Sequence, residues 1–315
     1  MLNRTAGGKM GKSHVIVGAS SVGIATARLL ASQGEHVRLV SRKGRGPDLP
    51  GVERVAADAT DADQMAGLAG DAAALYVCAA PPYDRWPQDW PSLASALLTA
   101  AERSGAVLVS HSNAYGYGPV TEPMTEQTPT SAWHPKLRIR ADIWREALAL
   151  HEAGRIRATE VRASDHIQPN SLFALALCKP LLEGKKVVSP IPLDVPHSWT
   201  SVDDAARLLV TVAIDERAWG RAWHAPTNPP LTARALATRF CEVENLPVPR
   251  LSVIPYPLLW TLGLFVPMLR EMRATRYQFA QPFILDSTAS TQVFGLAPMP
   301  IEEALRDTAR MLRAS

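Results

Sequence analysis

The first half of the chain alternates short apolar runs with longer stretches in which apolar residues recur at helical spacing. Runs of valine, isoleucine, leucine and alanine predict strands at residues 14–17, 37–40, 52–57, 74–79, 106–110 and 159–162. The intervening stretches predict helices at residues 22–34, 61–68, 90–104 and 133–153. Strands separated by helices of this length form a parallel sheet. The pattern therefore predicts an α/β fold of the Rossmann type, a doubly wound parallel sheet with its ligand crevice at the carboxyl ends of the strands.

The alternation loosens after residue 164, where proline becomes frequent. Helices are predicted there at residues 201–213, 232–243 and 301–312. This composition is typical of a smaller C-terminal lobe that lies over the sheet edge and holds a substrate. We therefore expect a flexible tail at residues 1–12, a dinucleotide-binding core at 13–164, and a mainly substrate-binding lobe at 165–315 that returns to the core in places.

A turn of small residues joins the first predicted strand to the first helix. Gly18, Ser20 and Gly23 have the spacing of G-x-G-x-x-G, with serine at the middle position. Gly18 allows a tight exit from the strand, and Gly23 lets the helix pack close to the sheet. Ser20, Ser21 and Val22 begin the helix, where free N–H groups and the helix dipole favour a pyrophosphate. The alternative is a tight turn that binds no ligand.

The end of the second predicted strand bears on the choice between NAD and NADP. NAD enzymes place an acid there, on the ribose 2′-hydroxyl. This chain has Ser41, Arg42 and Lys43 instead, and an arginine can stack on adenine and pair with a 2′-phosphate. We therefore expect NADP(H) as the cofactor. The alternative is a basic loop exposed to solvent.

Composition and charge limit the classes of partner. The chain has 315 residues, is 47% hydrophobic and carries a formal net charge of +3, with its basic residues spread along the sequence. These features favour a small-molecule substrate and neither a nucleic-acid nor a membrane partner. Three distant cysteines show no disulfide or zinc-ligand spacing, and no secretion signal or spanning segment is evident, so a cytoplasmic location is expected.

An ordered set of segments resembles the extended short-chain dehydrogenases/reductases, the family of NAD(P)-dependent epimerases, dehydratases and ketoreductases. The segments are the turn from Gly18 to Gly23, Asp58, Tyr117-Gly118, residues 161–164, and Val202-Asp203-Asp204. Asp203 alone is better explained as an acid in a helix cap. The resemblance implies that the cofactor contacts residues that follow the strands, namely Asp58, Ala59, Ala79, Ala80, Ala163 and Ser164. It also implies a homodimer through helices 90–104 and 133–153; the alternative is that each amphipathic helix has one buried face and no partner.

The chain departs from this family at the catalytic positions. In this family the tyrosine of a Tyr-x-x-x-Lys motif donates the proton, and a serine hydrogen-bonds to the carbonyl oxygen of the substrate. Here the tyrosine position falls on Lys136, the lysine on Arg140 and the serine on Asn113. Arg140 can hold the nicotinamide ribose but cannot release a proton at neutral pH, whereas Asn113 can donate to a carbonyl oxygen. The proton donor stays open between Lys136, Ser112, a water and the substrate's own hydroxyl. Further candidates near the same edge are His111, Tyr115, Tyr117 and His134.

Aromatic residues near the expected cleft favour a planar, apolar substrate. The predicted pocket residues are Trp86, Tyr115, Trp133, His134 and Trp199. Residues 165–200 contain no arginine to clamp a nucleotide diphosphate. By analogy with atypical ketoreductases of antibiotic pathways, including those that act on angucyclinones, the sequence predicts an NADPH-dependent ketoreductase. The alternatives are an epimerase or dehydratase that retains NAD(P), and a non-catalytic protein that senses NADP.

Overall fold

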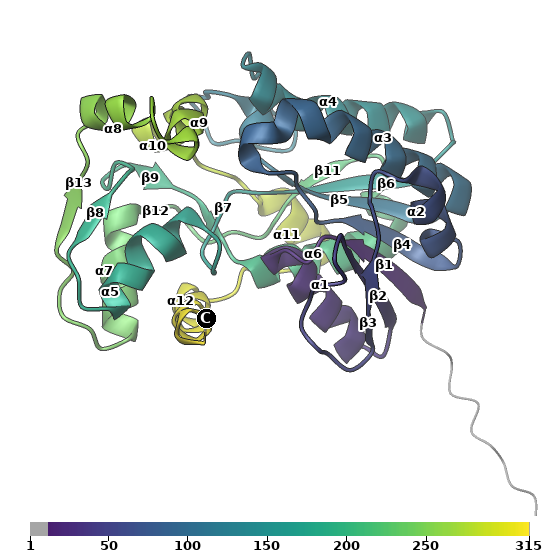
Figure 1. The fold of residues 1–315 in the computed structure, drawn as a ribbon, viewed down its shortest axis with the longest axis horizontal. Helices are drawn as coiled ribbons and strands as arrows, with labels where there is room; N and C mark the ends of the chain where they lie inside the picture. Colours follow the sequence, from purple (N-terminus) through teal and green to yellow (C-terminus); the bar gives the residue numbers. More distant parts are fainter. Residues whose placement is uncertain (1–11, 315) are drawn as a thin grey trace, which may run out of the picture.

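The computed structural model describes residues 12–314 and has a seven-stranded parallel sheet at its centre (Figure 1). Its strand order is β11-β6-β5-β4-β1-β2-β3. The strands are β1 (Ser13–Val17), β2 (His36–Ser41), β3 (Val52–Ala56), β4 (Ala72–Val77), β5 (Val107–Asn113), β6 (Ala158–Ala163) and β11 (Ala222–His224). The order reverses direction between β1 and β4, and this switch point is where such sheets bind ligands. The predicted Rossmann-type sheet is confirmed.

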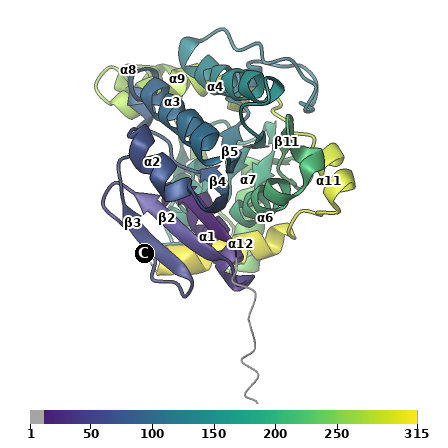
Figure 2. The same cartoon turned by 90° about the vertical axis from the view of Figure 1, so that its right-hand side faces the viewer.

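Helices cover both faces of the sheet, as Figure 2 shows from the side. One face carries α2 (Ala62–Ala69), α3 (Trp86–Ser104) and α4 (Pro135–Glu152), and the other carries α1 (Ser21–Ser32) and α6 (Val202–Ile214). Side chains alternate between the two faces along each strand. Val15 and Val17 therefore pack under α2 and α3, whereas Ile16 packs toward α1 and α6. Short helices η1 (Tyr83–Arg85), η2 (Tyr115–Tyr117), η4 (Glu216–Ala218) and α11 (Thr288–Phe294) complete this part.

The remaining elements form a lobe beside the core, with its own buried cluster (Figure 1). Its helices are the π-helix η3 (Ala174–Cys178), α5 (Lys179–Leu182), α7 (Ala233–Val243), α8 (Tyr256–Leu262), α9 (Pro267–Thr275), α10 (Tyr277–Ala280) and α12 (Ile301–Arg313). Its short strands pair as β7 (Asp165–His166) with β10 (Trp199–Thr200), β9 (Pro196–His197) with β12 (Leu231–Thr232), and β8 (Val187–Ser189) with β13 (Leu251–Val253). The chain returns from this lobe to the core through α6 and β11.

Several element boundaries differ by a few residues from the sequence predictions, among them those of α3, β5 and α4. Helix α3 begins at Trp86 rather than at residue 90, because Pro87 fits the first turn and Pro91 removes only one helical N–H. Strand β5 continues to Asn113 because its polar end pairs with β6. Helix α4 begins at Pro135, so residues 133 and 134 precede it.

Two further segments are the expected N-terminal tail and the apolar stretch near residue 260. Of the tail expected at residues 1–12, only Lys12 lies within the described residues, and its carbonyl accepts from His36 N–H. A largely apolar stretch of the sequence, residues 258–269, forms most of α8 and the start of α9. In residues 12–314, no helix is both long and apolar enough to cross a bilayer.

Candidate active site

The turn after β1 can be formed only by glycine at two positions. Gly18 has a φ of +109°, and a Cβ there would lie 2.4 Å from the backbone nitrogen of Ala79. A Cβ on Gly23 would lie 2.0 Å from the carbonyl oxygen of Gly18. The first turn of α1 is therefore pressed against the ends of β1 and β4. Backbone atoms form this corner, and a bound phosphate could approach it closely.

The N-terminus of α1 faces the lobe. Ser20 is the N-cap residue, and its hydroxyl accepts from Gly23 N–H at 3.1 Å. The Ser21 hydroxyl donates to the carbonyl of Pro169 at 3.0 Å, and Asn170 lies 3.4 Å from the same hydroxyl. The first N–H groups of a helix have no carbonyl partner within it, so this end is suited to an anion.

A cleft of about 620 Å³ starts at this helix end and runs along the carboxyl ends of β4, β5 and β6 to the lobe. Its core wall includes Ser20, Ser21, Val22, Ala79, Ala80, Ser112, Asn113, Arg140, Ala163 and Ser164. Its aromatic and lobe walls include Tyr83, Trp86, Trp90, Tyr115, Asp165, His166, Met272, Thr275, Gln278 and Phe279. Residues predicted to bind a cofactor and residues predicted to bind a substrate therefore line one continuous hollow.

Arg140 lies in this wall and is held in place on several sides. Its Nε donates to the Ser112 hydroxyl at 3.1 Å, and its Nη2 donates to the His111 carbonyl. The guanidinium also lies 4.4 Å from the centre of the Trp90 ring. Asn113, one step along β5, accepts from Tyr115 N–H through its side-chain oxygen at 3.1 Å, which leaves its amide N–H groups for the cleft.

Lys136 does not line the cleft. Its side chain is 4% exposed, and its Nζ lies 2.5 Å from the carboxylate of Glu271 on α9. The same Nζ lies 3.3 Å from the centre of the Tyr83 ring. Burial lowers the pKa of Lys136, and the bond to Glu271 partly offsets this effect. The amine thus joins the core to the lobe behind the aromatic wall.

Comparisons with known proteins support the architecture. The sequence model for the NAD dependent epimerase/dehydratase family matches residues 15–221, more than half of the chain. The chain belongs to this family.

Solved structures of similar proteins agree with this family member over nearly its whole length. WbmH of Bordetella bronchiseptica, in complex with NAD+, has 20% identity and a TM-score of 0.73, covering 96% of this chain and 99% of that one. UDP-glucose 4-epimerase of Thermotoga maritima, with UDP-glucose, has 15% identity and a TM-score of 0.78 over 96% and 99%. The dTDP-glucose 4,6-dehydratase DesIV of Streptomyces venezuelae has 19% identity and a TM-score of 0.73 over 96% and 98%. No curated protein matches the sequence.

These matches revise the functional prediction. The family match supports the epimerase/dehydratase alternative better than the ketoreductase prediction, and no comparison supports the resemblance to angucyclinone ketoreductases. The family is described as NAD dependent, and the WbmH and DesIV structures contain NAD, so the comparisons do not support the expectation of NADP.

The structure places several predicted residues of this epimerase/dehydratase family member away from the cleft. Trp133 is 74% exposed, and neither it nor His134 lines the cleft, because both precede α4. Trp199 is buried in the lobe core, where its indole N–H donates to the Leu231 carbonyl at 2.9 Å. A tryptophan that is predicted from its place in the sequence to line the cleft can thus pack into the interior of the neighbouring lobe instead.

The residues at the ends of β2 and β3 form an exposed edge. Ser41 donates to the Arg45 carbonyl at 2.9 Å, while Arg42 and Lys43 are exposed. Hydrogen bonds from the backbone and hydroxyl of Thr60 lower the pKa of Asp58, with a smaller contribution from the Arg42 charge. Ala59, the next residue, is half-buried. This edge is outside the 620 Å³ cleft, so it could hold only the adenosine end of a dinucleotide.

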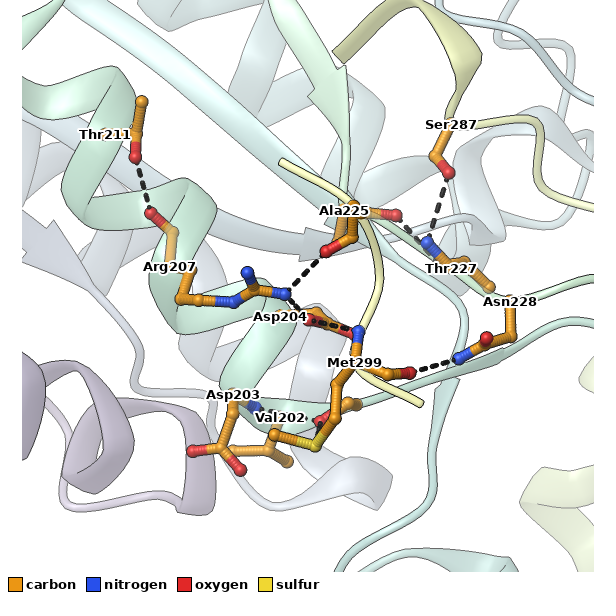
Figure 3. Close-up of polar contacts among 12 residues, drawn as sticks. Val202, Asp203, Asp204, Arg207, Thr211, Ala225, Thr227, Asn228, Ser287 and Met299 are labelled. Atoms are coloured by element: carbon orange, nitrogen blue, oxygen red, sulfur yellow. Dashed lines mark hydrogen bonds and ion pairs between the residues drawn. The ribbon is translucent and has the colours of Figure 1, made fainter. Parts of the chain in front are cut away.

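The acids of the Val202-Asp203-Asp204 segment lie at the start of α6 (Figure 3) and support the fold. They do not line the cleft. Ser201 is the N-cap of α6, and Asp203 lies in its first turn, as expected for an acid in a helix cap. The buried Asp204 carboxylate accepts from Met299 N–H at 3.0 and 2.9 Å and binds Arg207. It thereby fastens the segment before α12 to the core. Tyr117 is also buried, and its hydroxyl oxygen lies 2.6 Å from His224 Nε2.

Sequence reasoning assigned no role to two polar residues of the cleft wall, Asp165 and His166. His166 lies on its wall, with its ring stacked on His111 at 5.3 Å, and burial lowers the pKa of both imidazoles. Asp165 lies beside them and contacts His197 at 2.9 Å. The position of residues 165 and 166 directly after β6 was the available signal. The partner of Asp165 could not be found because it lies 32 residues further along the chain.

Proposed function

We propose that this chain binds a nicotinamide dinucleotide and transfers hydride to and from an alcohol or ketone carbon of a small molecule, as an epimerase or dehydratase that retains its cofactor. The observation that carries the proposal is the continuous cleft from the α1 N-terminus to the lobe. Family membership supports retention of the cofactor. When bound, the nicotinamide supplies or accepts the hydride.

The residues fit such a cofactor. Gly18 and Gly23 leave a corner that any Cβ would fill, next to the free N–H groups of α1. Two buried polar atoms of the cleft wall, the Ser164 hydroxyl and His111 Nε2, have no hydrogen-bond partner among the described residues. A bound ring that carries an amide group could form hydrogen bonds with both atoms. Ala79, Ala80 and Ala163 offer small side chains beside them.

We further propose that the cofactor is NADP(H). Arg42 is exposed, so it can stack on an adenine and pair with a 2′-phosphate without breaking a buried contact. Lys43 is exposed beside it. The carboxylate of Asp58 lies across the edge, where it can accept from the adenine amine.

The substrate that fits this wall is largely apolar. Among the described residues that line the cleft, Arg140 is the one lysine or arginine, and it already bonds Ser112 and His111. A nucleotide diphosphate usually needs a clamp of free arginines. The aromatic cluster of Tyr83, Trp86 and Tyr115, in edge-to-face and tilted contact, suits a planar apolar molecule instead.

This apolar wall also favours a second candidate function, net reduction of a ketone with release of the oxidised cofactor. In that reaction Asn113 would donate to the carbonyl oxygen and Arg140 would hold the ribose. Lys136 is bound to Glu271 outside the cleft, so its role as proton donor has no geometric support. Ser112 uses its oxygen as an acceptor for Arg140 and retains one proton to donate.

One experiment separates these functions. Purified protein is denatured and analysed for released nucleotide, and the native protein is then assayed by nicotinamide absorbance against apolar ketones and secondary alcohols. Copurified cofactor with substrate conversion and no net absorbance change supports the epimerase/dehydratase. Stoichiometric NADPH oxidation identifies a reductase. Binding with no conversion of any substrate would contradict both and identify a non-catalytic NADP sensor.

A further inference from the structure

Asp165 and His197 form a polar pair at the junction of the core and the lobe. Asp165 follows β6 directly and lines the cleft, whereas His197 lies in β9 inside the lobe. The carboxylate Oδ2 lies 2.9 Å from His197 Nε2. The other ring nitrogen, Nδ1, lies 3.0 Å from the carbonyl oxygen of Gln278. Both ring nitrogens therefore face an oxygen that can only accept, if Asp165 is ionised.

This geometry fixes the number of protons on the pair. A neutral imidazole has one N–H donor and one acceptor nitrogen, so it cannot donate to both oxygens. Either His197 carries a proton on each nitrogen, or Asp165 is protonated and donates to Nε2. Both arrangements hold one proton more than a neutral imidazole beside a carboxylate. The hydrogen-bond partners thus require a stored proton.

The surroundings of His197 keep this proton from bulk water. The ring stacks on Phe279 at 4.7 Å and on Phe283 at 5.5 Å, and lies 4.6 Å from Trp199. The histidine side chain is 2% exposed and that of Asp165 is 22% exposed. Faces of aromatic rings stabilise a cation held against them. The proton can therefore leave the pair only through Asp165, toward the cleft.

Other ionisable groups that face Asp165 are poorer proton sources. Tyr83 on η1, Tyr115 on η2 and Tyr277 on α10 all interact with its charge, and burial raises the pKa of each phenol. His166 on β7 also interacts with Asp165, and burial lowers the pKa of this imidazole, so it is neutral at pH 7. The cleft wall thus contains two phenols, Tyr83 and Tyr115, and two imidazoles whose pKa is lowered by burial, His111 and His166. The remaining group is the pair that must hold an additional proton.

We propose that the Asp165–His197 pair is the proton donor and acceptor of this active site, in place of the tyrosine that the chain lacks. This inference rests on the proposed function. As hydride forms the new C–H bond, the carbonyl π electrons move to oxygen, and the proton passes from the pair to that oxygen to form O–H. The ketone is reduced and the nicotinamide oxidised. The pair is left as a neutral imidazole beside a carboxylate, and oxidation of the alcohol returns its proton.

Asp165→Asn is a discriminating variant because it preserves shape and hydrogen bonding. The asparagine NH₂ can donate to Nε2 while His197 Nδ1–H donates to Gln278, so a neutral imidazole satisfies every contact. The variant is therefore expected to fold and to bind cofactor normally while losing the stored proton. Asp194→Asn is the matched control, because Asp194 pairs with Arg234 on the surface of the same lobe.

The test has two arms. Histidine side-chain NMR of the wild-type protein at about pH 8 should show two protonated nitrogens on His197 or a proton on Asp165. Asp165→Asn should show one N–H and a turnover rate lower by about 10²-fold, with unchanged cofactor affinity. Asp194→Asn should match the wild type.

One ring N–H and no aspartic proton in the wild type, or normal turnover in Asp165→Asn, would overturn the proposal. If the wild type converts no substrate, the proposed function fails while the NMR arm still decides whether the pair holds a proton.

Discussion

Lys136 on α4 and Glu271 on α9 form an ion pair of 2.5 Å that joins the Rossmann core to the lobe. The pair stands behind the aromatic wall, with the lysine amine over the Tyr83 ring. It therefore fixes the distance between the two walls of the cleft. A residue at the position of the missing tyrosine has a structural role here.

Lys136→Met should destabilise the protein and leave cofactor affinity intact. Removal of the amine leaves the Glu271 carboxylate half-buried without its partner, at a cost of roughly 1–3 kcal/mol in the free energy of unfolding. The double variant with Glu271→Gln should recover part of this loss in urea unfolding. A rate loss of 10²-fold or more with unchanged stability would instead identify Lys136 as the proton donor.

Gly23→Ala should abolish dinucleotide binding, because its Cβ would lie 2.0 Å from the Gly18 carbonyl and force α1 away from the sheet. Gly67→Ala is the matched control, since a Cβ at that position in α2 meets nothing within 4 Å. The control should gain roughly 0.5–1 kcal/mol of stability from helix propensity. Calorimetric titration measures both affinities, and equal affinities would rule out the turn as the phosphate site.

Arg42→Ala should weaken NADPH binding by about tenfold or more, since a charge-assisted bond to phosphate contributes roughly 1.5–3 kcal/mol. NADH binding should change little, because it lacks the 2′-phosphate. Arg45→Ala, an exposed arginine of the same loop, serves as the control. Equal losses for the two nucleotides would contradict the assignment of NADP.

Acid should destabilise the fold through His224. Burial lowers the pKa of this imidazole from 6.5 to about 4. Between these values the unfolded chain binds a proton that the folded chain does not, so stability falls as the pH falls, by up to roughly 3 kcal/mol. His224→Gln should flatten the profile of unfolding free energy against pH, while His36→Gln on the surface should not. A slope unchanged in His224→Gln would contradict this origin.

The sheet could be predicted from sequence because burial on both faces leaves continuous apolar runs, such as Val15-Ile16-Val17, at regular spacing. The glycine turn was equally readable, since Gly18 and Gly23 are required by sterics within one strand–turn–helix unit. These local patterns were enough to predict most of the residues in the core wall of the cleft. The lobe pattern was weaker, because its paired strands are only two or three residues long.

Contacts between distant segments could not be predicted. Glu271 lies 135 residues from Lys136, and no pattern marks the two as a pair. Likewise, the sequence predicts that both Trp133 and Trp199 line the cleft, but Trp133 is exposed and Trp199 is buried in the lobe. Which side a tryptophan faces depends on the packing of the whole lobe.

The central claim is that one cleft holds a nicotinamide dinucleotide against its substrate, and its most direct test is a titration with NADPH. The nicotinamide emission is excited through the tryptophans, of which Trp86 and Trp90 line the cleft. The account predicts saturable binding at one site per chain, with quenched tryptophan emission and sensitised nicotinamide emission. No saturable binding of NADPH, with none of NADH, would contradict it.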